Sequence, residues 1–381
     1  MLEVWLTNPQ RPSFPMNALF RTHAALLLTG LFSFVLMGAG QSLYGPALPA
    51  FARNLGLTLA EAGGLVSAHW VGCIAGVACM FAYGPKITPR VALGMMAAGA
   101  GLIASTPGLL GTIVGAVIFG AGYGCATVVF NPRVLAAFGD SGPSMLSLLN
   151  AVFSLGAIAA PLVFVALGST PSLTFGIVAA GCAVICVFAG AAGDTKDAVA
   201  TPSQPYKVHW GILAFGMISV GLEACLIGLG PTALVQAGET EAKAAQLLSL
   251  FFVAFLVARL TLVFAAKLLP SFTLYTVALG GAAFAATFGA MINPAISFIA
   301  IGVSAGLFFP SFFVTAARKM GTDPRVPATI VAAGLVGGIL SPILMSGLME
   351  SLGQRGFFWI IAAIAGATAL LALAVLRPMN R

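Results

Sequence analysis

The sequence predicts an all-α membrane protein whose twelve transmembrane helices form two pseudo-symmetric six-helix bundles, and three observations predict it. Of the 381 residues, 60% are hydrophobic and 7% are charged, with a mean hydropathy of +1.05, whereas soluble domains carry about 25% charged residues. The apolar runs have the ~20-residue length of membrane-spanning helices, not the ~10-residue alternation of barrel strands. The two halves of the chain also resemble each other in sequence.

Charged residues and Pro/Gly breaks divide the chain into twelve apolar segments, six before and six after a polar stretch. In order, they run over residues 22–50, 61–85, 90–107, 109–136, 144–168, 172–192, 209–235, 243–267, 271–290, 294–318, 325–348 and 355–377. Several exceed the ~20 residues needed to cross a bilayer, so we expect tilted helices or protruding ends.

The longest polar segment, GDTKDAVATPSQPY, separates segments six and seven. Its Pro, Ser, Thr and charged residues predict a flexible cytoplasmic linker between two halves. The expected organisation is a cytoplasmic tail (1–21), a six-helix bundle (22–192), the linker (193–208), a second six-helix bundle (209–377) and a short cytoplasmic tail (378–381). The stretch MLEVWLTNPQRPSFP is too polar for a cleavable signal, and the true start is Met1 or Met16.

An internal repeat supports this division. The sequence GAIAAP, from Gly156 in segment five, matches GGILSP, from Gly337 in segment eleven. Each motif follows a Gly-bearing loop, Gly139 in the first half and Gly321 in the second, by 17 and 16 residues. Two repeats around a central cavity are the usual construction of secondary transporters, which bind solute near the membrane midplane.

The basic residues predict the orientation. With both termini cytoplasmic, thirteen of the 17 Lys and Arg residues lie inside, three lie outside, and Arg259 lies within a segment. The inside set is Arg11, Arg21, Lys86, Arg90, Arg133, Lys196, Lys207, Lys267, Arg318, Lys319, Arg325, Arg377 and Arg381; the outside set is Arg53, Lys243 and Arg355. By the positive-inside rule, both termini are cytoplasmic, and we expect a multi-pass protein of the inner (plasma) membrane.

Several other functions find no support in the sequence. The net charge of +7 comes from basic residues standing singly between apolar runs, so it does not indicate nucleic-acid binding. No Walker-type sequence, paired acids, Ser/His/Asp arrangement or metal-spaced His/Cys cluster is present, so we expect neither an ATP-driven pump nor an enzyme, and no cofactor or metal. The six cysteines are interpreted as small buried apolar residues: Cys73, Cys79, Cys125, Cys182, Cys186 and Cys225.

Five stretches carry a family resemblance. Segment four contains GAGYGCATVVFNP (Gly120–Pro132), segment five LLNAVFSLGAIAAP, segment seven VGLEA, segment eight LVARLTLVFAAKLL and segment ten LFFPSFF. Six plus six spans around a central loop resemble the major facilitator superfamily, and these stretches resemble its fucose/glucose/galactose–proton symporter family. The resemblance extends from segment one to segment eleven, and it implies a secondary transporter whose halves rock about a midplane site.

The sequence departs from that family where the family carries protons. Its proton symporters use a carboxylate in span one and another in span four, and those positions fall here on Gly45 and Thr127. Neither residue can carry a proton. The loop GPKITPRVALG has Lys86 and Arg90 but lacks the Asp that the superfamily normally places there. Proton coupling therefore does not follow from the resemblance alone.

Three ionisable residues lie well inside the segments, where each charge costs about 2.5–3.5 kcal/mol on insertion scales. Glu223 is the acidic one, and it is either a proton carrier and solute ligand or a fixed structural partner. Arg259 either binds an anionic or hydroxyl-rich solute or latches helices together, with Glu223 as one partner. His69 is either a titrating group in a wet cavity or a neutral, hydrogen-bonded residue.

Uncharged residues complete the candidate site. Neutral donors and acceptors suit hydroxyl-rich solutes, and an aromatic ring suits the apolar face of a sugar; helix packing is the alternative for each. These candidates are Gln41, Tyr44, Trp70, Tyr123, Thr127, Asn131, Asn150 and Phe309. The glycines and proline around Glu223 predict a bent span, and Phe309-Pro310 predicts a kinked, aromatic-gated helix.

The predicted function is transport of a small polar solute, a sugar being the first candidate, with protons coupled through Glu223 and His69. The alternatives are a facilitator or exporter, including one for an organic anion held by Arg259, and a non-transporting receptor or assembly factor on the same fold. The expected partners are the solute, the lipid bilayer and protons as coupling ion, with no nucleic acid, and the expected state is a monomer.

Overall fold

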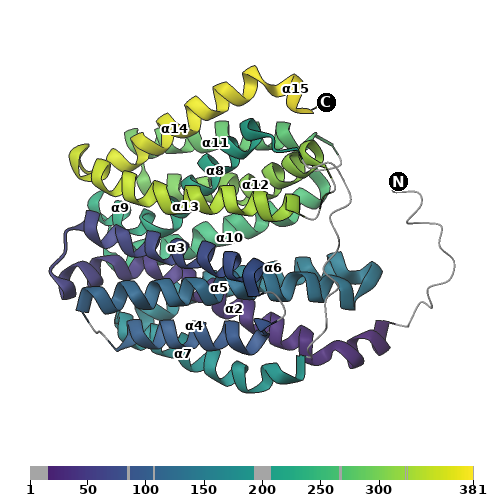
Figure 1. Cartoon of the computed structure of the whole chain (residues 1–381). Coiled ribbons are helices and arrows are strands. Elements are labelled where there is room, and N and C mark those ends of the chain that lie inside the picture. The colour runs from purple at the N-terminus through teal and green to yellow at the C-terminus, as the bar shows by residue number, and fades with distance from the viewer. Residues whose placement is uncertain are drawn as a thin grey trace.

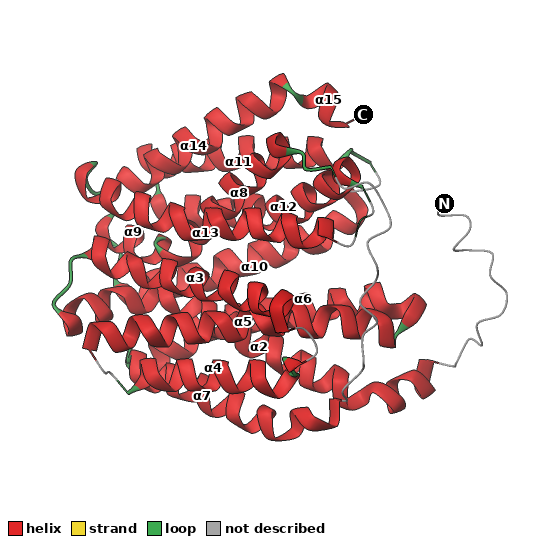
Figure 2. Ribbon diagram, in the orientation of Figure 1, coloured by secondary structure: helices red, strands yellow, loops and turns green. Residues whose placement is uncertain are grey.

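The computed structural model describes residues 16–83, 86–105, 108–192, 207–265, 268–321, 323 and 325–380. It is 90% helix and, over these residues, contains no strand (Figure 2). The predicted tail up to residue 15, most of the predicted linker (193–206) and the basic residues Arg11, Lys196, Lys267 and Arg381 lie outside the described residues.

The first half contains six long helices and two short 3-10 turns. They are α2 (Met16–Leu55), α3 (Leu59–Tyr83), α4 (Pro89–Ala104), α5 (Gly108–Ala137), η2 (Gly139–Ser141), α6 (Gly142–Ala166), α7 (Pro171–Phe188) and η3 (Ala189–Ala192). The backbone of α2 departs from helical geometry at His23 (φ −109°, ψ 15°). This first helix begins before residue 22, where the hydropathy pattern had placed its start, because hydropathy detects the apolar part of a helix and not its polar end.

The second half repeats this layout. Its helices are α8 (Trp210–Gly228), α9 (Gly230–Gln236), α10 (Glu241–Ala265), α11 (Ser271–Met291), α12 (Pro294–Met320), α13 (Arg325–Ser351), α14 (Gly356–Ala374) and α15 (Leu376–Asn380). Over the described residues, eleven helices are long and apolar enough to cross a membrane, and α4 is a shorter apolar helix. These correspond to the twelve predicted segments, so the chain is a multi-pass membrane protein.

The seventh predicted segment is not one helix. It divides at Leu229 into α8 and the short α9, with Gly230 and Pro231 at the start of α9. Proline lacks an N–H and fits the first turn of a new helix better than the interior of an old one. The bend predicted from these residues is therefore confirmed as a break. By contrast, α12 runs without interruption through Pro310.

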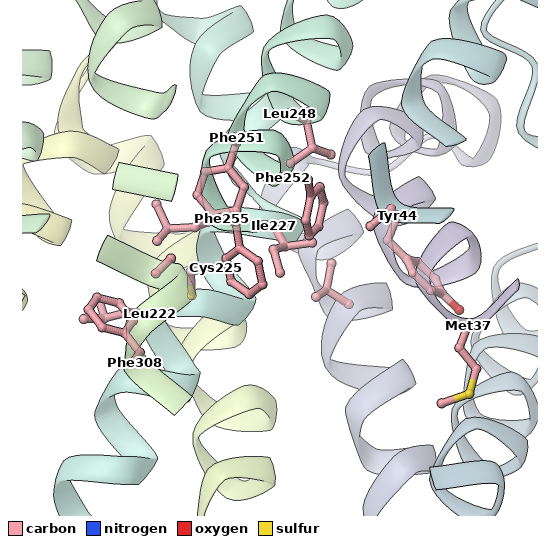
Figure 3. Close-up of a cluster of buried hydrophobic side chains, with 14 of the residues drawn as sticks. Met37, Tyr44, Leu222, Cys225, Ile227, Leu248, Phe251, Phe252, Phe255 and Phe308 are labelled. Carbon is pink, nitrogen blue, oxygen red and sulfur yellow. The ribbon is translucent and has the colours of Figure 1, made fainter. Parts of the chain in front are cut away.

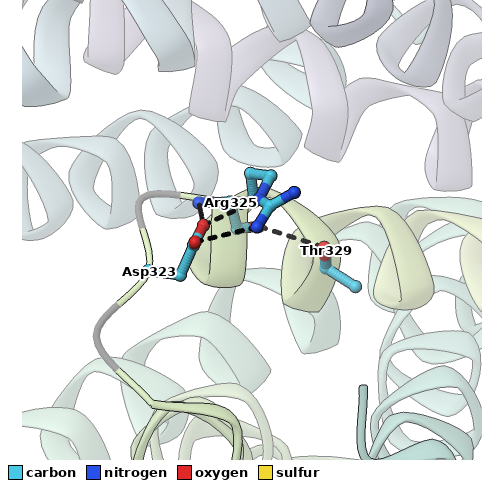
Figure 4. Close-up of polar contacts among 3 residues, drawn as sticks. All are labelled: Asp323, Arg325 and Thr329. Carbon is cyan, nitrogen blue, oxygen red and sulfur yellow. Dashed lines mark hydrogen bonds and ion pairs between the residues drawn. The ribbon is translucent and has the colours of Figure 1, made fainter. Parts of the chain in front are cut away.

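Polar side chains fix helix starts in the loops. Asn293 accepts a hydrogen bond from the Ile296 N–H (3.0 Å) at the start of α12. Before α13, Asp323 accepts bonds from the backbone N–H and the guanidinium of Arg325, each at 2.9 Å (Figure 4). These carboxylate and amide oxygens satisfy N–H groups that have no partner within the helix.

The helices of each half pack in the same order. In the first half α2 lies against α6, α3 against α5, and α4 against α5 and α7; in the second half α8 lies against α13, α10 against α12, and α11 against α12 and α14. Each helix pair of the second half corresponds to a pair of the first half, with both helices lying six transmembrane spans later in the chain. The two pseudo-symmetric bundles predicted from the repeat are confirmed.

The repeat motif makes the same helix crossing in each bundle. A Cβ atom at Gly156 would overlap the Val35 carbonyl of α2, and one at Gly337 would overlap the Met217 carbonyl of α8. Membrane helices approach closely where small residues face a neighbouring backbone. The matched glycines are thus the contact points of α6 with α2 and of α13 with α8.

The bundles meet along α3–α13 and α6–α10 and at the end of the molecule that carries α9. Figure 1 shows the first bundle below the second, with the ribbons spreading apart toward the end at which α2 begins and α15 lies. Inside the second bundle, buried Phe251, Phe252 and Phe255 of α10 pack near Leu222 and Ile227 of α8 (Figure 3).

One cysteine interpretation is wrong in part. Cys73, Cys125, Cys182 and Cys225 are buried, but Cys79 is exposed and Cys186 is half-buried. A thiol is apolar enough to face lipid, so a position inside a transmembrane segment does not determine burial.

Candidate functional site between the bundles

The first component of the candidate site is a pair of neutral polar residues from the first bundle. The Tyr123 hydroxyl of α5 donates a hydrogen bond of 2.9 Å to the Gln41 Oε1 of α2. Gln41 is 8% exposed and Tyr123 is half-buried. This bond orients the amide of Gln41, whose NH2 group remains available to a solute acceptor.

An aromatic cage surrounds His69. The ring lies 5.2 Å from Tyr44, 5.2 Å from Trp70, 5.6 Å from Phe119 and 5.3 Å from Tyr123, measured between ring centroids. His69 is 1% exposed, and among the described residues neither ring nitrogen has a hydrogen-bond partner. One interpretation of His69 is a neutral, hydrogen-bonded residue, and the hydrogen-bond partner that this interpretation requires is not found among the described residues.

Trp70 lies where the bundles touch. A Cβ at Gly338 of α13 would stand 3.2 Å from the Trp70 ring, so the indole packs directly on the α13 backbone. Cys73, Val77 and Leu335 continue this contact as a small buried apolar cluster. Trp70 is half-buried at this contact.

Glu223 contributes the acidic group from α8. The residue is half-buried, and its Oε2 atom is buried with no hydrogen-bond partner in the described part of the chain. Electrostatic interactions link Glu223 with Arg259 and both charges with Tyr123. The phenol of one bundle and the acid and base of the other thus lie near enough to interact electrostatically.

Arg259 of α10 is held by its own bundle. Its Nε donates to the Gly306 carbonyl of α12 (3.4 Å), and its guanidinium carbon lies 4.2 Å from the centre of the Phe255 ring. Of the ion pairs among the described residues, none joins Arg259 to Glu223 within 4.0 Å. The predicted contact with helix carbonyls is present, and the ion pair with Glu223 is absent.

The other predicted residues make no side-chain contact with Glu223 or Arg259 among the interactions of the described residues. Thr127 donates to the Tyr123 carbonyl of its own helix (3.0 Å), and exposed Asn150 donates to the Leu146 carbonyl of its own helix (2.9 Å). Asn131 is half-buried and Tyr44 is 2% exposed; within the described part of the chain, neither the Asn131 Oδ1 nor the Tyr44 hydroxyl has a hydrogen-bond partner. Phe309 packs against Phe312 and Phe313 of α12, at 6.3 and 5.6 Å.

Gly45 occupies a position that a carboxylate could not fill here. A Cβ at Gly45 would overlap the Ile227 carbonyl and lie 3.0 Å from the Pro231 ring. Bundle contact therefore explains why this residue is glycine where the resembling family has an acid.

Sequence reasoning missed the residues that position Arg259. Phe255 and Gly306 carry no isolated signal, since phenylalanines are frequent in this chain and Gly306 belongs to the glycine pair Gly302–Gly306 of α12. That four-residue spacing indicates close helix packing, and a Cβ at Gly306 would contact α10 at the Phe255 carbonyl. The spacing could therefore have indicated the α10–α12 crossing but not the arginine held there.

Comparisons with known proteins identify this arrangement of helices. No protein-family model and no curated protein matches the sequence. Among solved structures, a variant of the nucleoside transporter NupG superposes with a TM-score of 0.76 at 15% identity, over 94% of this chain and 100% of that one. The D-xylose–proton symporter superposes with a TM-score of 0.72 at 14% identity, over 91% and 96%. The chain has the major facilitator fold.

The resemblance found in the sequence is confirmed at the level of fold. The Escherichia coli fucose:proton symporter FucP superposes on this chain with a TM-score of 0.62 at 17% identity, over 93% of this chain and 98% of that one. In the major facilitator fold, the Gln41–Tyr123 pair and the Glu223 and Arg259 side chains come from different bundles. A ligand contacting all four would touch both bundles.

Proposed function

We propose that this protein is a secondary transporter that moves a small polar solute across the membrane by alternating access. The observation that carries the proposal is that Tyr123, hydrogen-bonded to Gln41 in one bundle, lies within electrostatic range of Glu223 and Arg259 of the other. The Glu223 Oε2 has no hydrogen-bond partner among the described residues. A carboxylate accepts hydrogen bonds from hydroxyl or amine groups, and a guanidinium donates them. One solute can thus bridge the bundles.

A sugar is the first candidate solute. The neutral Gln41–Tyr123 pair and the half-buried Trp70 ring suit hydroxyls and the apolar face of a sugar, and similar folds include a xylose and a fucose symporter. Arg259 supports the second candidate, an organic anion exported or exchanged without protons. The protein acts as a monomer in the inner membrane, with both termini cytoplasmic and the bundles at 22–192 and 209–377.

Protons are coupled through Glu223 in this proposal. Arg259 is fixed by Gly306 and Phe255, whereas Glu223 has no fixed partner among the described residues. A carboxylate in this setting can exchange a proton or a solute hydrogen bond as the bundles move. His69 is the second candidate for proton binding.

Purified protein in proteoliposomes tests the proposal. A thermal-shift screen against sugars, polyols, organic acids and amino acids first finds a solute, and uptake is then measured with and without an imposed proton gradient. Glu223→Gln should abolish gradient-driven accumulation, while Glu239→Gln, which replaces an acid in the loop before α10, should leave it unchanged.

The outcomes separate the alternatives. Stabilisation only by organic acids would favour the anion transporter over the sugar transporter. Unchanged pH-dependent accumulation by Glu223→Gln would remove Glu223 as proton carrier. A protein that accumulates and exchanges none of the solutes that stabilise it would favour the receptor.

A further inference from the structure

The bundles are sealed against each other at the end that carries α9. Gly45 of α2 fits against Ile227 and Pro231 beside the α8–α9 break. On the other side of the seam, a Cβ at Gly63 of α3 would stand 2.9 Å from the Ser346 Cβ of α13. These contacts join glycines to a carbonyl and to uncharged side chains, so they give close packing without a charge interaction.

One ion pair lies above the seam and joins the bundles. Arg53 is in the last turn of α2, and Glu241 is the first residue of α10. The guanidinium and carboxylate bind each other through two contacts, Nη1 to Oε1 and Nη2 to Oε2. The side chains are 60% and 31% exposed, so the pair is open to solvent and its attraction is screened by salt.

A pocket of about 350 Å³ lies beside the pair. Its lining comes equally from the two bundles: Pro49, Ala52, Arg53 and Leu57 from the first, and Thr232, Val235, Gln236 and Glu241 from the second. Thr232 is 3% exposed, and its hydroxyl has no partner among the described residues. Separation of the bundles would open this pocket and expose Thr232.

We propose that the Arg53–Glu241 pair is a releasable clasp that biases the molecule toward the conformation closed at this end. The inference rests on the proposed alternating access, because a clasp matters only if the bundles separate. Solvent-exposed pairs contribute weakly, so loss of this one should change the closed-to-open ratio by about two- to fivefold. A weak clasp favours closure yet still permits opening in every transport cycle.

Salt dependence distinguishes the two contributions to closure, the glycine seam and the ion pair. The glycine seam acts through shape and should not respond to ionic strength, whereas the ion pair should weaken as the Debye length falls from about 10 Å at 0.1 M salt to about 3 Å at 1 M. Closure should therefore loosen at high salt only while Arg53 and Glu241 are both present.

The test places a cysteine by Thr232→Cys and measures its rate of maleimide labelling in detergent-solubilised protein, quantified at position 232 by mass spectrometry. Arg53→Ala and Glu241→Gln should each raise the rate about two- to fivefold and remove its salt dependence. The charge exchange Arg53→Glu with Glu241→Arg should restore the slow rate. Lys243→Ala, a matched loss of a nearby exposed cation, should change nothing.

Equal labelling rates in wild type, both single variants and the exchange would overturn the clasp, as would a salt response that persists in Arg53→Ala. Gly45→Ala provides an independent comparison, because it should raise labelling by loosening the packing of the seam while the ion pair can still form, so the salt response should remain. Monodispersity on size exclusion shows that each variant is folded. The assay needs no solute, so failure to find transport and failure of the clasp are separate results.

Discussion

At the scale of single residues, the two charges of the site differ in how they are held. Arg259 contacts a carbonyl and an aromatic ring, while the Glu223 Oε2 has no hydrogen-bond partner among the described residues. A charge at membrane depth costs about 2.5–3.5 kcal/mol on insertion scales, so an unpaired acid is retained for exchange more readily than for structure. This asymmetry supports the proposal that Arg259 anchors the site and that Glu223 exchanges protons or hydrogen bonds.

Asp323 is an acid whose role is structural, and it lies between the membrane helices α12 and α13. The hydrogen bonds from the Arg325 side chain and backbone lower the pKa of its carboxyl below the usual value. An acid with a lowered folded pKa stabilises the fold above its unfolded pKa of about 3.9, and this contribution is lost as pH falls through the folded value.

Asp323→Asn should therefore lower the melting temperature at pH 7 and flatten its fall between about pH 4 and pH 2. The measurement is a series of melting curves of detergent-solubilised protein across that range, with Glu239→Gln as the control acid. An acid limb identical in Asp323→Asn and wild type would show that other carboxyls cause the loss of stability.

The candidate residues could be predicted from the sequence by type, but their neighbours could not. An acid in an apolar run identified Glu223, and the same reasoning identified Arg259 and His69. Nothing local indicates that Tyr44 lies against His69 or that Asn150 bonds to its own helix, because those contacts depend on helix rotation. The sequence therefore predicted more site residues than the structure brings together, because it indicates their depth in the membrane but not the direction of their side chains.

At the scale of elements, glycines determine which helices cross closely. Gly156 meets α2 and Gly337 meets α8 through equivalent crossings. The repeat between the two motifs could be predicted from the sequence, but the helices that they contact could not. A single glycine indicates that another backbone approaches closely, and it does not indicate which helix that backbone belongs to. The α8–α9 break was predictable, since Gly230 and Pro231 act on their own helix.

Two glycines of α13 give a matched test of close packing. Gly337→Ala should destabilise the protein by about 1–3 kcal/mol, because its Cβ would overlap the Met217 carbonyl. Gly347→Ala should be neutral or slightly stabilising, since nothing lies within 4 Å of the added Cβ and alanine favours helix. The measurement is the melting temperature of each variant. Equal values for the two variants would show that α8 and α13 are not in close contact at Gly337.

At the scale of the whole molecule, hydropathy alone predicted the number of spans and their approximate positions. Each helix must satisfy its backbone internally and be long enough to cross the bilayer, so span number and approximate bounds follow from composition. The assembly of the spans follows from side-chain shape instead. The sequence therefore predicted two bundles through their repeat, but not the α3–α13 and α6–α10 contacts between them.

Charge distribution makes one prediction about the molecule in its membrane. Arg318 and Lys319 donate to the Met379 and Pro378 carbonyls near the C-terminus (2.7 and 2.6 Å), so the basic end of α12 and the end of the chain lie together. Lys243 belongs to the opposite end, near Arg53 and Glu241, which has fewer basic residues. If the basic end is cytoplasmic, these two ends face different compartments.

Cysteines introduced by Lys243→Cys and Arg377→Cys, both exposed positions, test this in cells with a membrane-impermeant maleimide. Lys243→Cys should label in intact cells, and Arg377→Cys should label only after permeabilisation, because loops rich in Lys and Arg are retained inside. Labelling of both after permeabilisation confirms that each thiol is reactive. The reverse pattern in intact cells would invert the topology and place the Arg53–Glu241 clasp on the cytoplasmic side.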